Sequence, residues 1–445
     1  MVVRCGAPDV QVVILAGGRG TRLGDHARTI PKPMVTIGGR PNLEHQVLLA
    51  KRHGFTSVLF LVSHLADRVE AHFRDGQDFG IEISYCAEDP PLGTAGALCH
   101  ASALLRDRFL VLYGDVFVEC DLTRLWADHA NSRPFATLVV HPNDHPYDSD
   151  LVEADAEGWI SAIHPKPRSE DQYLPNLVNA GVAVLERKIL AMIPPGHYLD
   201  LASEIFPALA RDGGLRAYRS AEYFKDFGTP DRLARTRLDF ETGKTVRLSR
   251  GHRRPAVFLD RDGVINKAVW HLSDPAQMEL IPGAAEAIRR LNETGFLVVV
   301  VTNQPVVARG ECTSEVLQLI HNKMEALLGR EHAWIDVLYF CPHLPNKGFA
   351  GEVAELKVDC DCGKPKTRML EQAVREWNIS LSGSYGIGDS RRDVIAARRI
   401  GIGAIGVKTG RGCRDCDALE PPVQLVEDLG KAVDFILASD GVVPT

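Results

Sequence analysis

The stretch FLDRDGVIN, Phe258 to Asn266, places two aspartates, Asp260 and Asp262, directly after an apolar run. Side chains alternate between the two faces of a strand, so residues two apart project on the same side where a strand ends. A pair of carboxylates there can bind Mg²⁺, and one member can attack a phosphoryl group. A turn with capping aspartates is the alternative for any single Asp-x-Asp motif.

Three further polar segments follow this motif in the chain. VVVVTNQ ends an apolar run with Thr302 and Asn303, whose hydroxyl and amide suit a phosphoryl oxygen. CGKPK supplies Lys364, a cation that can balance a nucleophile and a phosphate, and GIGDSRRDV supplies Asp389 and Asp393. The four segments together favour phosphoryl chemistry over simple capping.

A second polar opening, LAGGRGTRL, follows an apolar run near the N-terminus and contains Gly17, Gly18, Gly20 and Arg22. Glycine lets backbone N–H groups approach a ligand closely, so such a loop can cradle phosphates. A dinucleotide fingerprint is excluded because Leu23 occupies a required glycine position, and no Gly-Lys-Ser/Thr ending forms a P-loop. A plain strand-to-helix turn is the alternative.

Two cysteine-containing segments have the ligand types of a zinc site. CPH supplies Cys341 and His343, and CDC supplies Cys360 and Cys362. Three thiolates and one imidazole form a closed, tetrahedral, structural zinc site. The intervening segment lacks an apolar period, so we expect a metal to order it. Reduced cysteines in loops are the alternative, and CRDC, with no second pair, is expected to have no special role.

Both halves of the chain alternate apolar runs with helical patterns, which predicts βα units and mainly parallel sheets. Examples are VQVVILAGG, SVLFLVSH and RFLVLYGDV in the first half and RPAVFLDRDG, GFLVVVVTNQ and GSYGIGDS in the second. A charged segment poor in apolar periodicity separates the two sets. We therefore expect an α/β protein with domains at 1–240 and 255–445, joined by a linker at 241–254.

Composition narrows the class of protein. A chain of 445 residues exceeds what one hydrophobic core usually supports. A net charge of −7 without a dominant basic stripe argues against nucleic acid as a partner, and no apolar run predicts a membrane span. The ten cysteines are scattered, so we expect mostly reduced thiols and a cytoplasmic protein.

The N-terminal half resembles the sugar-1-phosphate nucleotidyltransferase family. Its signature G-G-x-G-T-R-L…P-K-P is matched by residues 17–23 and 31–33. The resemblance implies a Rossmann-like fold in which Asp115 and Asp226 hold Mg²⁺ while Arg22, Lys32 and Lys166 neutralise phosphate charge. It also implies base and sugar contacts from Gly17, Gly18, Gly20, Gly93, Asn179, Gly181 and Glu204. Each of these residues alone has a commoner role as a turn, cap or surface residue, and their order in the chain favours the family.

The C-terminal half resembles haloacid dehalogenase-type phosphatases, whose four motifs occur here in order. The resemblance implies that Asp260 is the nucleophile that becomes an aspartyl phosphate and that Asp262 is the acid and base. Asp260, Asp389 and the backbone carbonyl of Asp262 would hold Mg²⁺. Thr302, Asn303 and Lys364 would bind the phosphoryl group, in a Rossmannoid fold carrying the zinc loop.

Together, LDRDGVIN, TNQPVVARG, CPH…CDCGKP and GDSRRD resemble the D,D-heptose 1,7-bisphosphate 7-phosphatases, with histidinol phosphatases as relatives. Arg309 is then an expected substrate contact. Pro305 and Val306 replace the usual Ser-Gly, and Gly363 replaces a basic or amide residue that could touch the distal phosphate. These departures leave the substrate and anomer open.

The two resemblances suggest consecutive steps, in which a phosphatase makes heptose 1-phosphate and a nucleotidyltransferase, with GTP favoured, activates it. Nucleoside triphosphates and sugar phosphates are then the partners, and the oligomeric state, a homo-oligomer included, stays open. One alternative is a hexose-1-phosphate transferase fused to an unrelated phosphatase. The other is a silent domain that senses a sugar nucleotide.

Overall fold

A computed structural model describes residues 10–18, 31–169, 171–417 and 419–439, which form two compact units. The first unit comprises Met1–His141, Val152–Pro165 and Asn179–Gly251, and the second comprises Pro142–Leu151, Lys166–Val178 and His252–Thr445. The units separate in sequence within the segment expected to be a linker. Two short segments of the first half group with the second unit.

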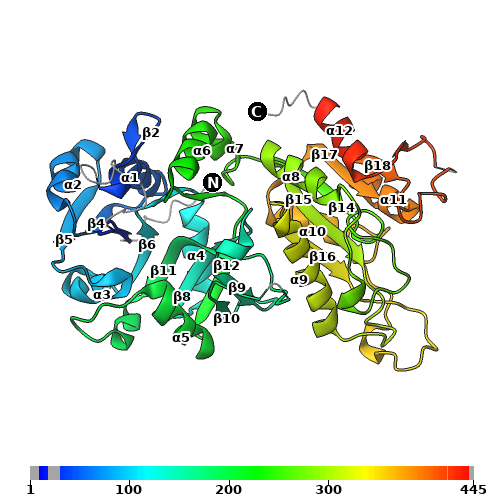
Figure 1. Ribbon diagram of the computed structural model, residues 1–445, viewed down its shortest axis with the longest axis horizontal. Helices are drawn as coiled ribbons and strands as arrows, with labels where there is room; N and C mark the ends of the chain where they lie inside the picture. The colour runs from blue at the N-terminus through cyan, green and yellow to red at the C-terminus, as the bar shows by residue number, and fades with distance from the viewer. Residues whose placement is uncertain (1–9, 19–30, 170, 418, 440–445) are drawn as a thin grey trace, which may run out of the picture. The chain divides into compact units, whose positions relative to one another are not determined.

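The first unit is built on a large sheet with a parallel centre (Figure 1). The order is β10-β9-β11-β6-β1-β4-β5, and β1 pairs parallel with β4 and β6. β11 runs antiparallel to β6, a departure from the mainly parallel expectation. The strands are β1 (Gln11–Leu15), β4 (Ser57–Val62), β5 (Glu82–Ala87), β6 (Arg108–Tyr113), β8 (Ala136–His141), β9 (Leu151–Ala154), β10 (Ile160–His164), β11 (Val178–Glu186) and β12 (Leu215–Arg219).

Short elements complete this unit. The small strands β2 (Thr36–Ile37) and β3 (Arg40–Pro41) pair, as do β7 (Val116–Glu119) and β13 (Tyr223–Asp226). Ile37, Phe117, Tyr223 and Phe227 form a separate apolar cluster, against which Leu248 of the expected linker packs. The helices are α1 (Asn42–Arg52), α2 (Ala66–Phe73), α3 (Gly93–His100), α4 (Leu122–Ser132), α5 (Phe206–Arg211), α6 (Pro230–Glu241) and α7 (Lys244–Arg247).

The second unit contains a six-stranded, fully parallel sheet of order β16-β15-β14-β17-β18-β19. The chain leaves β14 on one side toward β15 and β16 and returns on the other side to β17. This reversal creates a switch point, and ligands of such sheets bind there, beyond the carboxyl ends of the strands. The strands are β14 (Arg254–Leu259), β15 (Leu297–Asn303), β16 (Val337–Cys341), β17 (Ile379–Gly388), β18 (Gly403–Val407) and β19 (Gln424–Val426).

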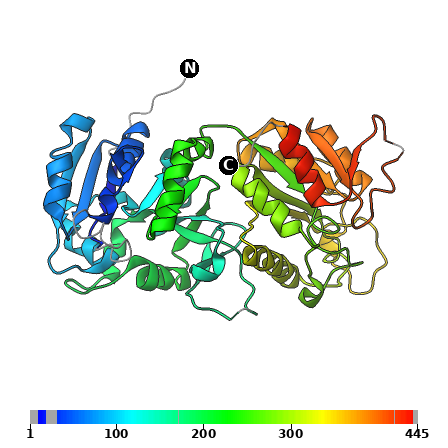
Figure 2. The ribbon, with the colours of Figure 1, turned by 45° about the horizontal axis from the view of Figure 1, so that its top comes forward.

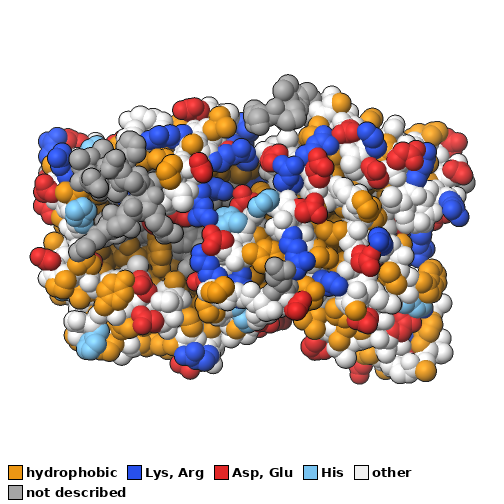
Figure 3. All heavy atoms as spheres, viewed as in Figure 1, with side chains coloured by type: hydrophobic (Ala, Val, Ile, Leu, Met, Phe, Trp, Pro, Cys, Tyr) orange, Lys and Arg blue, Asp and Glu red, His pale blue; other side chains and the backbone are white. Residues whose placement is uncertain are grey.

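Helices cover this sheet, and α8 and α12 lie side by side (Figure 2). Their apolar faces pack with Val257, Leu259, Val298 and Val300 in one core. The visible surface of the unit mixes Lys and Arg with Asp and Glu (Figure 3). The helices are α8 (Ala284–Thr294), α9 (Ser314–Arg330), α10 (Arg368–Glu376), α11 (Arg391–Arg399) and α12 (Leu429–Ser439). The α/β class expected for both halves is confirmed.

One pair of cysteines, for which no special role was expected, forms a disulfide bond. Cys413 and Cys416 of CRDC are both buried and joined by a disulfide, whereas seven other cysteines of the described chain are free. The three-residue spacing brings the thiols together within one turn. Among the described residues, no helix is both long and apolar enough to cross a membrane.

Candidate active sites

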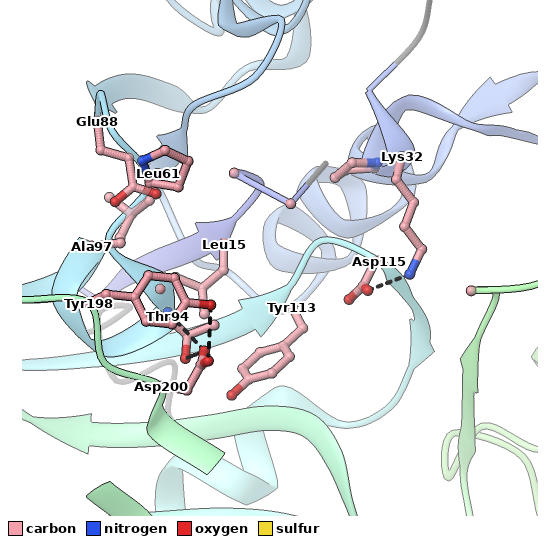
Figure 4. Close-up of a pocket in the computed structure, with 16 residues that line it drawn as sticks. Leu15, Lys32, Leu61, Glu88, Thr94, Ala97, Tyr113, Asp115, Tyr198 and Asp200 are labelled. Carbon is pink, nitrogen blue, oxygen red and sulfur yellow. Dashed lines mark hydrogen bonds and ion pairs between the residues drawn. The ribbon is translucent and has the colours of Figure 1, made fainter. Parts of the chain in front are cut away.

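The first unit contains a pocket of about 650 Å³ at the carboxyl ends of its central strands (Figure 4). Glycine-rich backbone lies on one side, and polar side chains from α3, β6 and a later segment lie on the others. Its lining includes Leu15, Gly17, Gly18, Lys32, Leu61, Glu88, Gly93, Thr94, Ala97, Tyr113, Asp115, Tyr198, Asp200 and Gly228. Gly20 and Arg22, expected in the same loop, lie outside the described residues.

Lys32 lies between the two aspartates expected to hold a metal. Its Nζ is 2.5 Å from Asp115 Oδ2 and 3.6 Å from Asp226 Oδ1, and the lysine is buried. Burial would raise the pKa of Asp226, but Lys32 and Arg232, whose Nη1 is 2.6 Å away, outweigh it and hold the pKa below its usual value. The Asp226 carboxylate is therefore held in its charged form, and two carboxylates beside a buried cation suit an Mg²⁺–triphosphate complex.

The start of α3 is packed unusually close to the segment before the π-helical turn Leu201–Ile205. Gly93 has φ of +76°, and a Cβ there would lie 2.5 Å from the carbonyl oxygen of Leu199. A Cβ on Gly96 would lie equally close to the carbonyl of His197. Only glycine allows this approach, because any side chain would collide with backbone. The contact joins two walls of the pocket.

Thr94 and Asp200 lock these two walls together. Asp200 Oδ1 accepts hydrogen bonds from the Thr94 amide at 3.2 Å and hydroxyl at 2.9 Å, and Thr94 Oγ1 accepts one from the Leu201 amide at 2.8 Å. Figure 4 shows both residues and Tyr198 on the side of the pocket away from Lys32. These hydroxyl and carboxylate groups can bind sugar or ribose hydroxyls.

Glu88 also lies on this side, at the end of β5. Its Oε2 accepts a hydrogen bond from the Leu92 amide at 3.0 Å, and a Cβ on Gly17 would lie 3.0 Å from its Oε1. Burial raises the pKa of Glu88 above its ordinary value. The carboxylate thus faces a ligand surface where N–H donors would stabilise its ionised form.

Four residues expected at the sugar site have other contacts. Lys166 Nζ bonds to Asp148 at 2.8 Å and the side chain is exposed; Asn179 Oδ1 accepts from the Gly181 amide at 3.0 Å. Gly181 has φ of +71° and packs on Tyr113. Glu204 Oε2 accepts from the Asp200 amide at 2.7 Å. Glu204 thus supports a pocket residue, and the expected direct sugar contacts of all four stay predictions.

The second unit gathers four buried charged residues at the switch point. Lys364 Nζ lies 2.9 Å from Asp260 Oδ1 and 2.6 Å from Asp393 Oδ1, and carboxylate oxygens of Asp260, Asp389 and Asp393 lie within 4.8 Å of one another. Asp260 follows β14 and Asp389 follows β17, so the parallel topology brings them together. Three carboxylates around one lysine fit an Mg²⁺ ion, because oxygen ligands are what Mg²⁺ prefers.

Burial raises the pKa of Asp260, because it outweighs the opposing effect of Lys364. Burial also raises the pKa of Asp389 to about 7, with the negative charges of Asp260 and Asp393 adding to the effect and the Arg411 amide partly offsetting it. The cluster thus carries more negative charge than Lys364 alone can balance. A divalent cation would relieve this excess.

The Asp262 carboxylate points away from this cluster. It accepts hydrogen bonds from the fully buried Arg261, from Asn266 Nδ2 at 3.0 Å and from Gln304 Nε2 at 2.8 Å. Burial would raise its pKa, but Arg261 and these amides outweigh burial and lower it. Asp393, rather than the Asp262 side chain, completes the carboxylate cluster.

The end of β15 connects the phosphoryl motif to its neighbours. Asn303 Nδ2 donates to the Lys364 carbonyl at 3.0 Å, and the Lys364 amide donates to Asn303 Oδ1 at 2.9 Å. Thr302 Oγ1 accepts a hydrogen bond from Gln304 Nε2 at 2.8 Å, and the backbone N–H of Gln304 donates to the Cys341 carbonyl at 2.7 Å. Asn303 therefore fixes the backbone that carries Lys364.

The four expected zinc ligands lie together. Sγ of Cys341 is 3.4 Å from Sγ of Cys360 and 3.2 Å from Sγ of Cys362, and His343 Nδ1 is 3.2 Å from Cys362 Sγ. Tetrahedral Zn–S bonds of 2.3 Å give S–S separations of about 3.8 Å. The donor set therefore fits a structural zinc ion, although the sulfur atoms lie slightly closer together than in a filled site. A Cβ on Gly363 would meet two cysteine sulfur atoms and the Asn303 amide nitrogen, all at 3.4 Å or more, so the missing side chain is not a steric requirement.

Comparisons with known proteins agree with this geometry. Residues 11–243, slightly more than half of the chain, match the Nucleotidyl transferase family. The chain belongs to that family. Residues 361–432 match the HAD-hydrolase-like family, so the second half is a HAD-like phosphatase. The chain is an enzyme with both activities.

Three relatives illustrate the two halves of the bifunctional enzyme. A mannose-1-phosphate guanylyltransferase of Mycobacterium tuberculosis is 35% identical over 55% of this chain and 68% of its own length. A UTP–glucose-1-phosphate uridylyltransferase of Synechocystis is 34% identical over 47% of this chain, which spans 57% of that relative. A D-glycero-beta-D-manno-heptose-1,7-bisphosphate 7-phosphatase of Yersinia pestis is 40% identical over 35% of this chain and 82% of its own length.

Sequence reasoning missed several residues of both sites. Thr94 and Asp200 are more than a hundred positions apart in the sequence. Their hydrogen bonds depend on the close packing of Gly93 against Leu199, which the sequence does not show. Arg261 and Gln304 could have been found from the sequence, because each lies next to a motif residue directly after an apolar run. A charged or amide side chain in such a buried place needs a hydrogen-bond partner. Asp393 was noted as an acidic residue but not as a member of the metal cluster.

Proposed function

We propose that the enzyme makes a nucleotide-activated heptose in two steps. The phosphatase half removes the 7-phosphate of D-glycero-D-manno-heptose 1,7-bisphosphate, and the nucleotidyl transferase half couples the resulting heptose 1-phosphate to a nucleotide, with GTP favoured. The likeness of the second half to heptose bisphosphate phosphatases, on the same chain as a sugar-phosphate nucleotidyl transferase, carries this proposal. The product of one step is the substrate of the other.

In the phosphatase half, an Asp260 oxygen attacks the phosphorus of the 7-phosphate and the bond to the sugar oxygen breaks. Once the Asp262 carboxylate leaves the Arg261 contact that lowers its pKa, it takes up a proton from water and passes this proton to that oxygen. Water then attacks the aspartyl phosphate, gives its proton to Asp262, and releases phosphate while restoring Asp260. Lys364, placed by Asn303, and the Thr302 hydroxyl offset phosphoryl charge.

In the transferase half, an oxygen of the sugar 1-phosphate attacks the α-phosphorus of the triphosphate and pyrophosphate leaves. No protein nucleophile is required, so alignment and charge neutralisation supply the rate enhancement. Lys32 lies beside Asp115 and Asp226, where the phosphates would meet. Arg22 is proposed to assist from the glycine-rich loop.

Both halves have residues that fit Mg²⁺, and the second fits Zn²⁺. We assign Mg²⁺ to Asp115 and Asp226 in the transferase half and to Asp260 and Asp389, with the Asp262 carbonyl, in the phosphatase half. When bound, Mg²⁺ screens the charge of the phosphates and carboxylates. Zn²⁺ on the three cysteines and His343 would order the loop that ends at Lys364.

Glu88 supports the choice of GTP. Guanine offers two adjacent N–H donors on one edge, its ring N1–H and its 2-amino group, and a carboxylate can accept both. Adenine presents an acceptor at that edge, and uracil or thymine a single N–H flanked by carbonyl oxygens, which repel a carboxylate. A Glu88→Gln variant should therefore lose preference for GTP over the other triphosphates.

Phosphorus NMR on the whole enzyme with Mg²⁺, the heptose bisphosphate and each triphosphate in turn tests the proposal. Phosphate release followed by pyrophosphate and a diphosphate-bridged sugar supports it and names the base. Phosphate release without a sugar nucleotide from any triphosphate would redirect the transferase to hexose 1-phosphates. Binding without turnover at either site would support a sensor.

Separate variants divide the two steps. Asp260→Asn should abolish phosphate release while nucleotidyl transfer from supplied heptose 1-phosphate continues. Asp434→Asn, an exposed aspartate paired with Arg290, is the matched control and should leave both steps intact. Loss of both activities in Asp260→Asn would contradict two independent sites.

A further inference from the structure

The loop that follows β18 lies directly against the phosphatase carboxylates. Thr409 Oγ1 donates to the Gly263 carbonyl at 2.6 Å, and the Arg411 amide donates to Asp389 Oδ2 at 2.8 Å. A Cβ on Gly410 would lie 2.6 Å from Gly263 Cα, so the two loops meet backbone to backbone. The side chain of Arg411 therefore starts beside the place where the reacting phosphate must bind.

The Arg411 guanidinium lies over an exposed aromatic ring. Its centre is 5.6 Å from the ring of Trp270, which itself stacks on His271 at 5.0 Å. Trp270 is 77% exposed, the highest exposure among the large apolar side chains of the described chain. Within the described residues, no carboxylate forms an ion pair with Arg411. The stack thus holds a guanidinium with no direct carboxylate contact beside the phosphatase carboxylates.

Arg309, the cation expected to contact substrate, is in a different situation. Its Nη1 lies 2.7 Å from His271 Nε2 and 3.9 Å from Glu311, and its guanidinium lies over Phe349 at 4.7 Å. Glu311 also contacts His271 Nδ1 at 2.8 Å. Part of the charge of Arg309 is therefore balanced by a direct ion pair, whereas Arg411 interacts with Asp389 only at longer range and forms no ion pair within the described residues.

We propose that Arg411, oriented by Trp270, binds the second phosphate of the sugar bisphosphate, the one that the enzyme does not hydrolyse. This inference rests on the proposed phosphatase function and assigns the residue that selects bisphosphates over monophosphates. A guanidinium binds a phosphate through two parallel N–H donors, and its planar face stacks well on an aromatic ring. Trp270 acts by positioning the guanidinium.

The test compares two substrates that lose the same 7-phosphate and differ only at C1, the heptose 1,7-bisphosphate and the heptose 7-phosphate. Arg411→Met keeps the backbone amide that contacts Asp389, so the Mg²⁺ concentration for half-maximal activity should stay unchanged. Hydrogen bonds to a charged group are strong enough that the ratio of kcat/KM for bisphosphate over monophosphate should fall on the order of 10- to 100-fold. The change should lie mainly in KM.

Two further variants sharpen the result. Arg414→Met removes an exposed arginine three positions along the same loop and should leave the ratio unchanged. Trp270→Leu should lower the ratio by a smaller factor, through KM, because the guanidinium remains but loses its support. An unchanged ratio in Arg411→Met, or equal losses on both substrates, overturns the inference. A wild-type enzyme that releases no phosphate from the bisphosphate overturns the proposed substrate itself.

Discussion

Replacing Lys364 by methionine should destabilise the second unit far more than a surface lysine would. Lys364 forms ion pairs of 2.9 Å with Asp260 and 2.6 Å with Asp393, and each of the three side chains is less than a tenth exposed. Burial opposes the charge of Lys364, but the two carboxylates outweigh it and raise the lysine pKa. Removing one partner from a buried ion pair costs about 3–5 kcal/mol.

Hydrogen exchange measured by mass spectrometry can locate this loss within the two-unit chain. In metal-free buffer at pH 7, protection of β14 and β17 peptides should fall roughly 100- to 4,000-fold, since each 1.4 kcal/mol is tenfold. Peptides of β1 in the first unit are the internal control. Without the lysine, the already raised pKa of the Asp260 carboxyl rises further. The variant is then most stable at low pH, where this carboxyl is protonated, and loses stability as the pH rises through the raised pKa.

Lys366→Met is the matched control. Lys366 lies two residues away, is 40% exposed and pairs with an exposed Asp359, so its removal should change protection of β14 and β17 far less than the removal of Lys364. Added Mg²⁺ should restore part of the protection in Lys364→Met by binding the same carboxylates. Similar protection in the two variants would refute the argument that the buried pairs hold the charge of this site.

Other predictions concern metals and packing. Because the pKa of Asp389 is raised to about 7, Mg²⁺ must displace its proton below that pH; calorimetric affinity should fall from pH 8 to 6, approaching about tenfold per unit. Cys360→Ser should lower bound zinc, measured by mass spectrometry, whereas Cys312→Ser should not. Gly93→Ala should sharply reduce nucleotidyl transfer because its Cβ meets the Leu199 carbonyl; Gly196→Ala, with similar φ and open space, should lower thermal stability slightly without that loss.

Sequence reasoning predicted the fold because periodic apolar runs and their spacing specify strands and crossovers locally. The strands that lead to Asp260, Asn303 and Asp389 were all expected, and the parallel topology places their ends together. The antiparallel β11 was not expected, because a buried strand has the same apolar pattern in either direction.

The sequence predicted which residue types belong to each site, but it did not predict how their side chains are oriented. Ligand identity at the zinc cluster follows from residue type, and the structure brings those four residues together. The orientation of Asp262 could not be read, because it depends on Arg261 and Gln304 from separate positions in a folded core. The pairing of Thr94 with Asp200 likewise depends on a tertiary contact between distant segments.

The tight contact of Gly93 and Gly96 with the carbonyls of Leu199 and His197 has a consequence for altering substrate range. The first turn of α3 and the segment carrying Tyr198 and Asp200 are expected to move together, because the Thr94 hydroxyl hydrogen-bonds to both Asp200 and the Leu201 amide. An engineer who reshapes one wall to admit a different sugar will displace the other wall as well. Libraries aimed at new sugar acceptors should therefore randomise residues 93–97 and 197–201 jointly.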